Sequence, residues 1–261
     1  MRTRLISAVI LLPAVIGLIV LGGVPYFVAV VVVMSLAAFE FNRLMQRGGH
    51  RPPLWVALVL VVALMLDVAA PQLNEWRPAI SFILIGSLTW QLWHRQGQPV
   101  SDWALAVTSG LYLGVAGEHF VLLRLLPEGE RWLLLTLVGT WLADSGAYFV
   151  GSRFGRHKMT PALSPRKSWE GLAGGVIVGP VLNAGVASLF GLPLSAGAML
   201  GLIGATVGTL GDLSISMIKR QVGAKDSGQL IPGHGGALDR LDSLLFTVIV
   251  GYYYLIWFMP L

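Results

Sequence analysis

The sequence of 261 residues contains no cysteine. This absence excludes a disulfide framework, a thiolate metal site and a cysteine nucleophile. Motifs of many soluble enzymes are missing as well: there is no GxxxxGK[ST] phosphate loop, no HExxH zinc pair and no GxSxG nucleophile turn. Any catalytic chemistry must therefore depend on residues outside these motifs.

Charged residues are also scarce, at 12% of the chain, whereas a typical soluble domain has about 25%. Apolar runs recur along the chain, and roughly 20 such residues suffice to cross a bilayer core as a helix. The runs are continuous rather than alternating, which argues against a transmembrane β-barrel. We therefore predict an all-α polytopic membrane protein. Its transmembrane helices, about nine in number, are expected at residues 5–22, 25–44, 53–70, 77–93, 101–123, 131–151, 170–191, 194–217 and 241–259.

The basic residues predict the orientation of these helices. With the N-terminus in the cytoplasm, fifteen of the eighteen Lys and Arg residues fall in cytoplasmic segments. The positive-inside rule favours this arrangement. It also accounts for the net charge of +5, so no nucleic-acid partner is expected. The first apolar run lacks a small-residue cleavage site and leads directly into the second, so we expect it to be retained as a helix.

Polar residues are distributed unequally. Residues 1–130 have the composition of ordinary membrane helices and are predicted to be a scaffold that faces lipid or supports oligomerisation. Residues 131–261 are predicted to be the catalytic region, with cytoplasmic loops at 152–169 and 218–240. In the eighth span, small residues recur at the spacing of a close helix–helix contact, which permits a homodimer without requiring one. These residues are Gly197, Gly201, Gly204, Gly208 and Gly211.

Four aspartates lie in or beside predicted helices near their cytoplasmic ends. They are Asp144, Asp212, Asp239 and Asp242. Each acid could simply pair with a nearby base such as Lys219 or Arg240. However, a charge at the centre of a membrane helix costs at least about 2.5 kcal/mol, so such residues usually have a function. Their common level favours a shared ion site, and oxygen donors without cysteine favour Mg²⁺ or Mn²⁺ over Zn²⁺.

The neighbouring loops have features of a phosphate-binding surface. The Gly-rich segment PGHGGALDR, residues 232–240, leads into a helix, where backbone N–H groups can bind an anion. The segment SPRKSWEG precedes another helix in the same way. Each feature alone is equally typical of an ordinary turn or topology signal. The side chains that could bind phosphate from these loops are Ser164, Lys167, Ser168, Lys219, Arg220, Lys225 and Arg240.

The stretch SMIKRQVGAKDSGQLIPGHGGALDRLD, residues 216–242, resembles the signature of phosphatidate cytidylyltransferases, the CDP-diacylglycerol synthases. Residues 144–155 and 164–171 look like two further cytoplasmic segments of that family. The N-terminal half is similar only in hydropathy and number of spans. The resemblance implies transfer of a cytidylyl group from CTP to phosphatidic acid, giving CDP-diacylglycerol and pyrophosphate. It also implies Mg²⁺, often with a monovalent cation such as K⁺.

The resemblance further implies where the protein acts and with which residues. We expect an integral protein of the bacterial cytoplasmic (inner) membrane, in contact with membrane lipids and with its active site facing the cytoplasm. The metal ligands would be Asp212, Asp239 and Asp242. The catalytic residues would be Asp212, Lys219, Lys225, Asp226, His234, Asp239 and Asp242. With the residues identified above, the substrate-binding candidates are Asp144, Ser164, Lys167, Ser168, Ser216, Arg220, Gly235, Gly236 and Arg240.

Two candidate roles stay open, and two positions depart from the family pattern. His234 could either fix its loop by a hydrogen bond or take part in the reaction, by contacting a phosphate or transferring a proton. Asp144 could be a ligand or could support one. Ala237 follows GHGG where a larger aliphatic residue is usual. Ile215 precedes the signature serine where many members have Glu, which leaves any role of that Glu in doubt here.

Two other functions fit part of the pattern. An ion-coupled transporter binds its ions through intramembrane carboxylates near the membrane midplane. Here the acids lie at one cytoplasmic level beside basic loops, and the chain lacks two repeated halves with interrupted helices. A related lipid nucleotidyl- or phosphotransferase would use the same scaffold with a different lipid or nucleotide.

Overall fold

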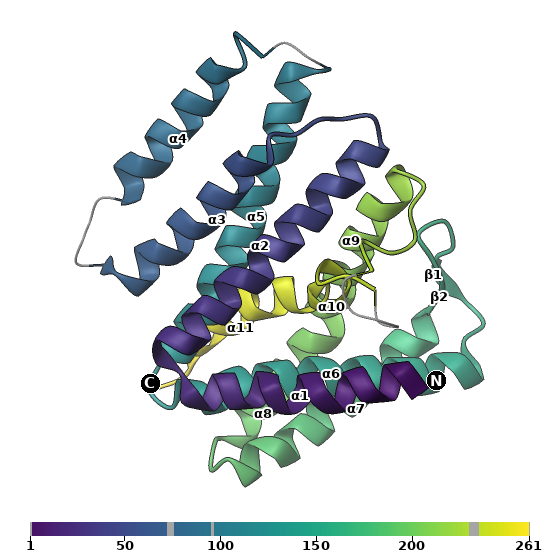
Figure 1. Ribbon diagram of the computed structural model, residues 1–261. Coiled ribbons are helices and arrows are strands. Elements are labelled where there is room, and N and C mark those ends of the chain that lie inside the picture. Colours follow the sequence, from purple (N-terminus) through teal and green to yellow (C-terminus); the bar gives the residue numbers. More distant parts are fainter. Residues whose placement is uncertain (1, 72–75, 95–96, 230–234, 261) are drawn as a thin grey trace. The chain divides into compact units, whose positions relative to one another are not determined.

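The computed structural model describes residues 2–71, 76–94, 97–229 and 235–260. Helices form most of the described chain, and one short hairpin interrupts them (Figure 1). In chain order the elements are α1 (Arg2–Leu21), α2 (Gly23–Arg47), α3 (Leu54–Ala69), α4 (Trp76–Trp90), α5 (Pro99–Leu125), α6 (Gly129–Phe154), β1 (Lys158–Thr160), β2 (Ser164–Ser168), α7 (Trp169–Leu189), α8 (Leu194–Ile203), η2 (Gly204–Gly208), α9 (Thr209–Gln221), α10 (Leu238–Leu241) and α11 (Leu244–Phe258).

Apolar helices occur at all the positions predicted for membrane spans. Among the described residues, six helical segments are long and apolar enough to cross a membrane. They are Gly23–Arg47, Pro99–Leu125, Gly129–Phe154, Trp169–Leu189, Leu194–Gln221 and Leu238–Phe258. Shorter apolar helices lie at Leu11–Leu21, Leu54–Ala69 and Pro78–Trp90. The all-α polytopic membrane fold is therefore confirmed, whereas the count of nine spans and the cytoplasmic N-terminus stay predictions.

The chain divides into two compact units. Unit 1 comprises Met1–Leu122 and Lys219–Arg240, and unit 2 comprises Leu123–Ile218 and Leu241–Leu261. Residues 219–240, which contain most of the signature, thus pack with the first helices of the chain. The functional division into a scaffold, 1–130, and a catalytic region stays a prediction.

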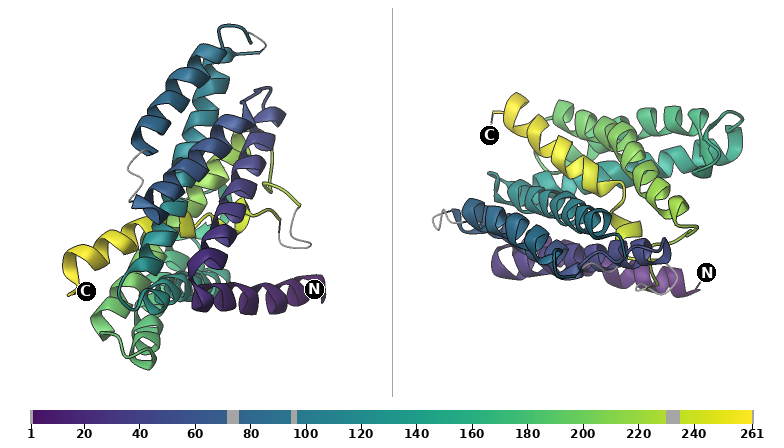
Figure 2. Two further views of the ribbon diagram at one scale, coloured as in Figure 1. Left: turned by 60° about the vertical axis from the view of Figure 1, so that its left-hand side comes forward. Right: turned by 90° about the horizontal axis from the view of Figure 1, so that it is seen from above.

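Unit 1 is organised around α3, which lies beside α4 and α5 (Figures 1 and 2). Val56 and Leu60 of α3 and Ala106 of α5 are fully buried, and apolar side chains of α4 pack against them. Helix α2 is joined to α5 by the phenol of Tyr26, which donates a hydrogen bond to the carbonyl of Phe120 at 2.9 Å. These contacts hold α2, which carries an acid described below.

Unit 2 consists mainly of α6, α7, α11 and residues 194–218 of the continuous helical segment Leu194–Gln221, which is made of α8, the π-helical turn η2 and α9. The glycines of this segment face its neighbours closely. A Cβ atom at Gly201 would lie 2.5 Å from the carbonyl oxygen of Gly179 on α7, and one at Gly204 would lie 2.8 Å from Cα of Thr140 on α6. The predicted packing role of this glycine face is confirmed, and these contacts form within the chain.

These contacts predict a difference between two glycines of unit 2. Gly201→Ala is expected to destabilise the protein by about 1–3 kcal/mol, because the added methyl group overfills the α7–α8 contact. The control is Gly185→Ala on α7, where a Cβ atom has nothing within 4 Å. This change is expected to be neutral or stabilising by up to about 1 kcal/mol, because alanine is the better helix former. Thermal unfolding in detergent measures both, and equal melting temperatures would contradict the expectation.

The predicted cytoplasmic loop 152–169 contains the hairpin β1–β2. Its strands are antiparallel, with Lys158 opposite Ser168 and Thr160 opposite Ser164. Helix α7 begins at once after β2 because the hydroxyl of Ser168 accepts a hydrogen bond from Gly171 N at 3.1 Å, which caps the helix. The hairpin therefore holds its basic residues at a fixed place beside α7.

Candidate active site

A cavity of about 290 Å³, lined in part by polar side chains, lies within unit 2. It is formed by α6, the β1–β2 hairpin, the start of α7 and the start of α9. Three substrate-binding candidates from the hairpin, together with Asp144 and Asp212, meet there. The polar side chains that line the cavity are those of Asp144, Tyr148, Ser164, Arg166, Lys167, Ser168, Thr209 and Asp212.

Lys167 and Asp212 form an ion pair in this cavity. The Nζ atom of Lys167 lies 2.8 Å from Oδ2 of Asp212 and also donates to the carbonyl oxygen of Thr209 at 3.3 Å. The two side chains keep 21% and 29% of their surface exposed, so both remain accessible to a ligand. The pair joins the hairpin to the first turn of α9, which places a cation and a carboxylate at one point.

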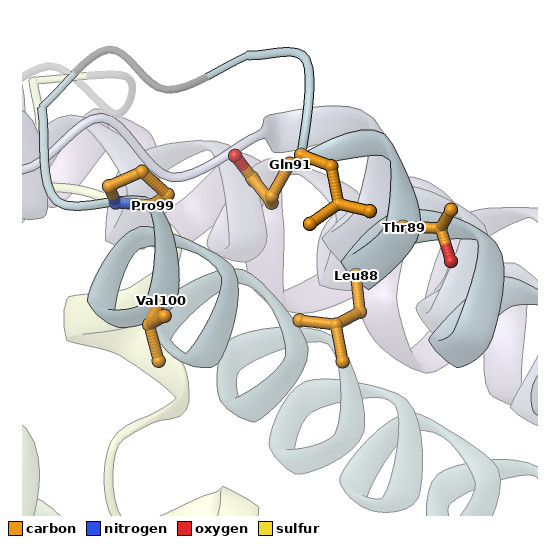
Figure 3. Close-up of a pocket in the computed structure, with 6 residues that line it drawn as sticks. Leu88, Thr89, Gln91, Pro99 and Val100 are labelled. Atoms are coloured by element: carbon orange, nitrogen blue, oxygen red, sulfur yellow. The ribbon is translucent and has the colours of Figure 1, made fainter.

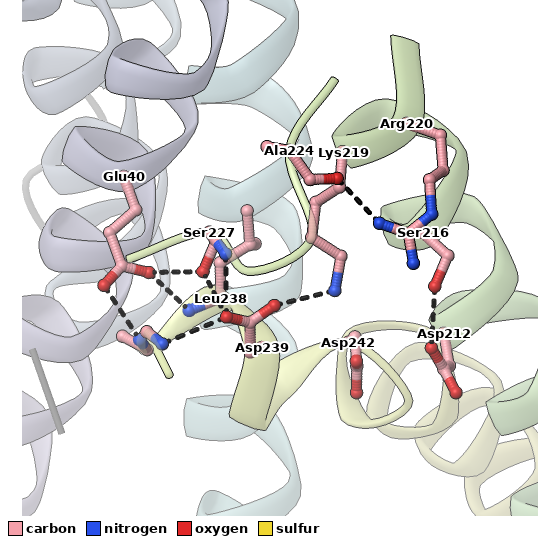
Figure 4. A network of polar contacts seen from close by, with 12 residues as sticks. Glu40, Asp212, Ser216, Lys219, Arg220, Ala224, Ser227, Leu238, Asp239 and Asp242 are labelled. Atoms are coloured by element: carbon pink, nitrogen blue, oxygen red, sulfur yellow. Dashed lines mark hydrogen bonds and ion pairs between the residues drawn. The ribbon is translucent and has the colours of Figure 1, made fainter. Parts of the chain in front are cut away.

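Helix α9 adds a second polar group to Asp212. The hydroxyl of Ser216, one turn further along the helix, donates a hydrogen bond to Oδ1 of Asp212 at 3.2 Å (Figure 4). Ile215 is fully buried, so the position where the family often has Glu faces the protein interior here. Asp212 therefore has both oxygens in contact with partners, one cationic and one neutral.

Asp242 belongs to unit 2 as well. A Cβ atom at Gly211 would collide with the carbonyl oxygen of Asp242, so the residue next to Asp212 packs directly against the segment that carries Asp242. The Asp242 side chain accepts a hydrogen bond from the backbone N–H of Ser243 at 2.8 Å. Among the described residues, no three His, Asp or Glu side chains are arranged to hold a metal ion. The predicted ligand set of three aspartates stays a prediction.

A second polar cluster lies in unit 1 and contains Asp239 and Lys219 (Figure 4). Their side chains are 6% and 9% exposed, and Lys219 Nζ lies 2.7 Å from Oδ1 of Asp239. The other oxygen, Oδ2, accepts hydrogen bonds from the backbone N–H groups of Ser227 at 2.8 Å and Gly236 at 3.0 Å. Asp239 thus binds the backbone of Ser227 and of Gly236 as well as the buried ammonium group of Lys219.

Sequence reasoning missed an acid of this cluster, Glu40, as well as Ser227. Glu40 lies on α2 within the second predicted span and is only 3% exposed. Its carboxylate accepts hydrogen bonds from the backbone N–H groups of Ala237 and Leu238, at 3.0 and 2.9 Å. An acid inside an apolar run is the signal that identified the four aspartates, and it applies equally to Glu40.

The remaining signature candidates have mixed surroundings. Lys225, Asp226 and Arg240 are exposed. The guanidinium group of Arg220 donates to the carbonyl oxygen of Ala224 at 2.7 Å, just beyond the end of α9. Gly235 has a φ of +82°, a conformation that favours glycine. His234 lies outside the described residues, so its two alternative roles stay open.

Another cavity, of about 540 Å³, lies in unit 1 between α4 and α5 (Figure 3). No ionisable side chain is among its lining residues. The residues that line it are Leu88, Thr89, Gln91, Leu92, Pro99 and Val100. The ionisable candidates lie instead in the cavity of unit 2 and, separately, in the cluster of unit 1 around Asp239.

The sequence is similar to known proteins over nearly its whole length. Residues 2–258 match the model of the cytidylyltransferase family. A phosphatidate cytidylyltransferase of Synechocystis is 34% identical, over 98% of this chain and 97% of its own length. Proteins of the same name from Bacillus subtilis and Pseudomonas aeruginosa are 30% and 36% identical, over 99% and 96% of this chain and 98% and 95% of their own lengths. The chain therefore belongs to the cytidylyltransferase family.

Proposed function

We propose that this protein transfers a cytidylyl group from CTP to phosphatidic acid, which gives CDP-diacylglycerol and pyrophosphate. Full-length similarity to enzymes named for this activity supports the reaction. The observation that carries the proposal in the structure is the cavity of unit 2, where Lys167 meets Asp144 and Asp212. Such a site offers positive charge for phosphate groups and oxygen donors for a divalent ion.

The reaction needs no covalent enzyme intermediate. A phosphate oxygen of phosphatidic acid attacks the α-phosphorus of CTP, and the new P–O bond forms as the bond to pyrophosphate breaks. Both substrates are anions, so the protein must offset their mutual repulsion and orient them for the reaction. Lys167 in unit 2 and Lys219 in unit 1 are the bases to which we assign charge neutralisation. Ser216 holds the Asp212 carboxylate in orientation.

The chemistry of the proposed donors, carboxylate oxygens without cysteine, suits Mg²⁺. Its proposed ligands, Asp212, Asp239 and Asp242, offer hard carboxylate oxygens, and Asp144 adds another in the cavity with Asp212. Mg²⁺ usually takes one or two protein carboxylates and completes its shell with water and substrate phosphate. When bound, it would neutralise charge on the phosphates during transfer. A monovalent cation such as K⁺, which the resemblance supports, and the use of Mn²⁺, which the oxygen donors favour, are further proposals.

We also propose that the protein lies in the bacterial cytoplasmic membrane with its active site facing the cytoplasm. Supporting this, the named relatives are bacterial, six described helices have membrane length, and CTP is a cytoplasmic metabolite. The loops that carry the candidate residues are also the basic ones, as the positive-inside rule requires of cytoplasmic loops. A homodimer stays a prediction.

Purified protein in detergent micelles tests the reaction. With CTP, phosphatidic acid and Mg²⁺, we expect CDP-diacylglycerol and pyrophosphate in equal amounts. Excess EDTA is expected to abolish both products, and added Mg²⁺ should restore them. Replacing CTP by ATP or omitting the lipid are the controls. Product formation that persists in EDTA would contradict the metal requirement, and ion uptake by proteoliposomes without any lipid product would favour a transporter.

A further inference from the structure

Glu40 contacts two described stretches of the turn between α9 and α10, residues 227–228 and 235–238. Its Oε1 atom accepts from Ala237 N at 3.0 Å, and its Oε2 atom accepts from Leu238 N at 2.9 Å (Figure 4). Consecutive backbone N–H groups at the start of α10 are thus bound by one carboxylate. A charged acceptor makes such hydrogen bonds stronger than those between neutral groups. All these residues belong to unit 1.

The turn is shaped around this carboxylate. A Cβ atom at Gly228 would lie 2.5 Å from Oε1 of Glu40, and one at Gly236 would collide with both carboxylate oxygens. Side chains at these two positions are therefore excluded by Glu40 itself. Gly228 and Gly236, the second of which the sequence suggested as a substrate-binding position, here permit the close approach of a side chain from α2.

Hydrogen bonds and an ion pair connect Glu40, through Ser227, to the predicted catalytic residues Asp239 and Lys219. The hydroxyl of Ser227 lies 2.9 Å from Oε2 of Glu40 and 2.9 Å from Oδ2 of Asp239. Asp239 in turn pairs with Lys219 through its other oxygen. Glu40, Ser227, Asp239 and Lys219 are all at least nine-tenths buried, so this network is shielded from water. Partly satisfied buried networks are costly, which makes each member sensitive to loss of another.

We propose that Glu40 is a positioning residue for the cytidylyl transfer assigned above. It holds residues 235–238 and Ser227, and through them it fixes the orientation of Asp239 and Lys219. Glu40 acts through these groups rather than by touching a substrate. This inference rests on the proposed function, but the contact between α2 and the turn can be measured without any catalysis. An N-terminal helix thereby becomes part of the catalytic machinery.

Glu40→Gln tests the proposal with two independent measurements. The amide has one acceptor oxygen and places an NH₂ group against a backbone donor, so one of the two backbone hydrogen bonds from Ala237 and Leu238 to residue 40 is lost. Hydrogen–deuterium exchange of peptides covering residues 235–241 is expected to become at least tenfold faster. At saturating CTP and phosphatidic acid, kcat is expected to fall by about 10- to 100-fold, as misplacement of reacting groups does. Glu40→Asp, which keeps the charge, is expected to recover part of kcat.

The matched control is Glu118→Gln, a glutamate inside α5 that is not among the partners of the turn in the described structure. Its exchange at 235–241 and its kcat are expected to match the wild type. A wild-type kcat in Glu40→Gln would overturn the proposal, and so would a lost kcat with unchanged exchange at 235–241. If Glu40→Gln fails to fold, the exchange at 235–241 and the kcat of Glu40→Asp test the proposal in its place. If the wild type makes no CDP-diacylglycerol but Glu40→Gln still accelerates exchange, the proposed function fails while the contact stands.

Discussion

Asp212→Asn is expected to lower the turnover of CTP and phosphatidic acid by at least about a hundredfold, the usual cost of removing one electrostatic group from a reacting centre. The substitution would leave Lys167 without its carboxylate and would remove a proposed metal ligand. The fold should survive, because the Lys167–Asp212 pair is partly exposed and such pairs contribute about 0–1 kcal/mol. Pyrophosphate release and thermal unfolding, measured on the same purified sample, separate the two effects.

The dependence of the rate on Mg²⁺ concentration tests whether Asp212 is a metal ligand. If Asp212 is a ligand, the residual activity of the Asp212→Asn variant should need a higher Mg²⁺ concentration for half-maximal rate. Asp67→Asn on α3 is the control, since this acid also lies in an apolar helix but is not among the residues that line the cavity. The control should turn over like the wild type. Turnover of Asp212→Asn within twofold of the wild type would remove this residue from the site.

Asp239→Asn is expected to lose both activity and stability. The Lys219–Asp239 pair is more than nine-tenths buried, and removing one partner of such a pair typically costs about 3–5 kcal/mol. The amide oxygen can still accept from Ser227 N and Gly236 N, but its NH₂ group would face the ammonium of Lys219. We therefore expect a large drop in melting temperature together with at least a hundredfold loss of turnover.

A second substitution separates these two losses. Lys219→Met in the Asp239→Asn background removes the unpaired charge and keeps an apolar chain of similar length. The melting temperature should then recover most of its loss, because a buried ion pair can be replaced by uncharged groups at little cost. Turnover should stay lost, since both proposed catalytic groups are absent. Recovery of turnover along with stability would show that the pair serves the fold alone.

The helices were predictable because their signal is long and redundant. An apolar run such as 25–44 or 101–123 contains many residues that all favour the same outcome, so an error at one of them changes little. The hairpin β1–β2 was not predicted, since its strands have only 3 and 5 residues and no apolar alternation marks them. Its register depends on tertiary contacts with α6 and α7 rather than on local pattern.

The candidate site was predictable in its residues but not in their pairing. Charge in an apolar setting identified Asp144, Asp212 and Asp239, and one suggested alternative, pairing of an acid with Lys219, is present for Asp239. The partner of Asp212 is Lys167, 45 positions earlier, and nothing local specifies a contact over that separation. Glu40 was overlooked because it lies near the end of an apolar run otherwise typical of a plain membrane helix.

The π-helical turn η2 sets the direction in which the cavity residues of α9 point. A π-turn accommodates one residue more than an α-helical turn, and each residue in an α-helix advances the rotation by about 100°. Deleting one residue of Gly204–Gly208 to restore regular α-helix would therefore rotate Asp212 and Ser216 together by roughly that angle relative to α8. Because of this one extra residue, a single helical segment can present its glycines to α6 and α7 and then direct the carboxylate of Asp212 toward Lys167.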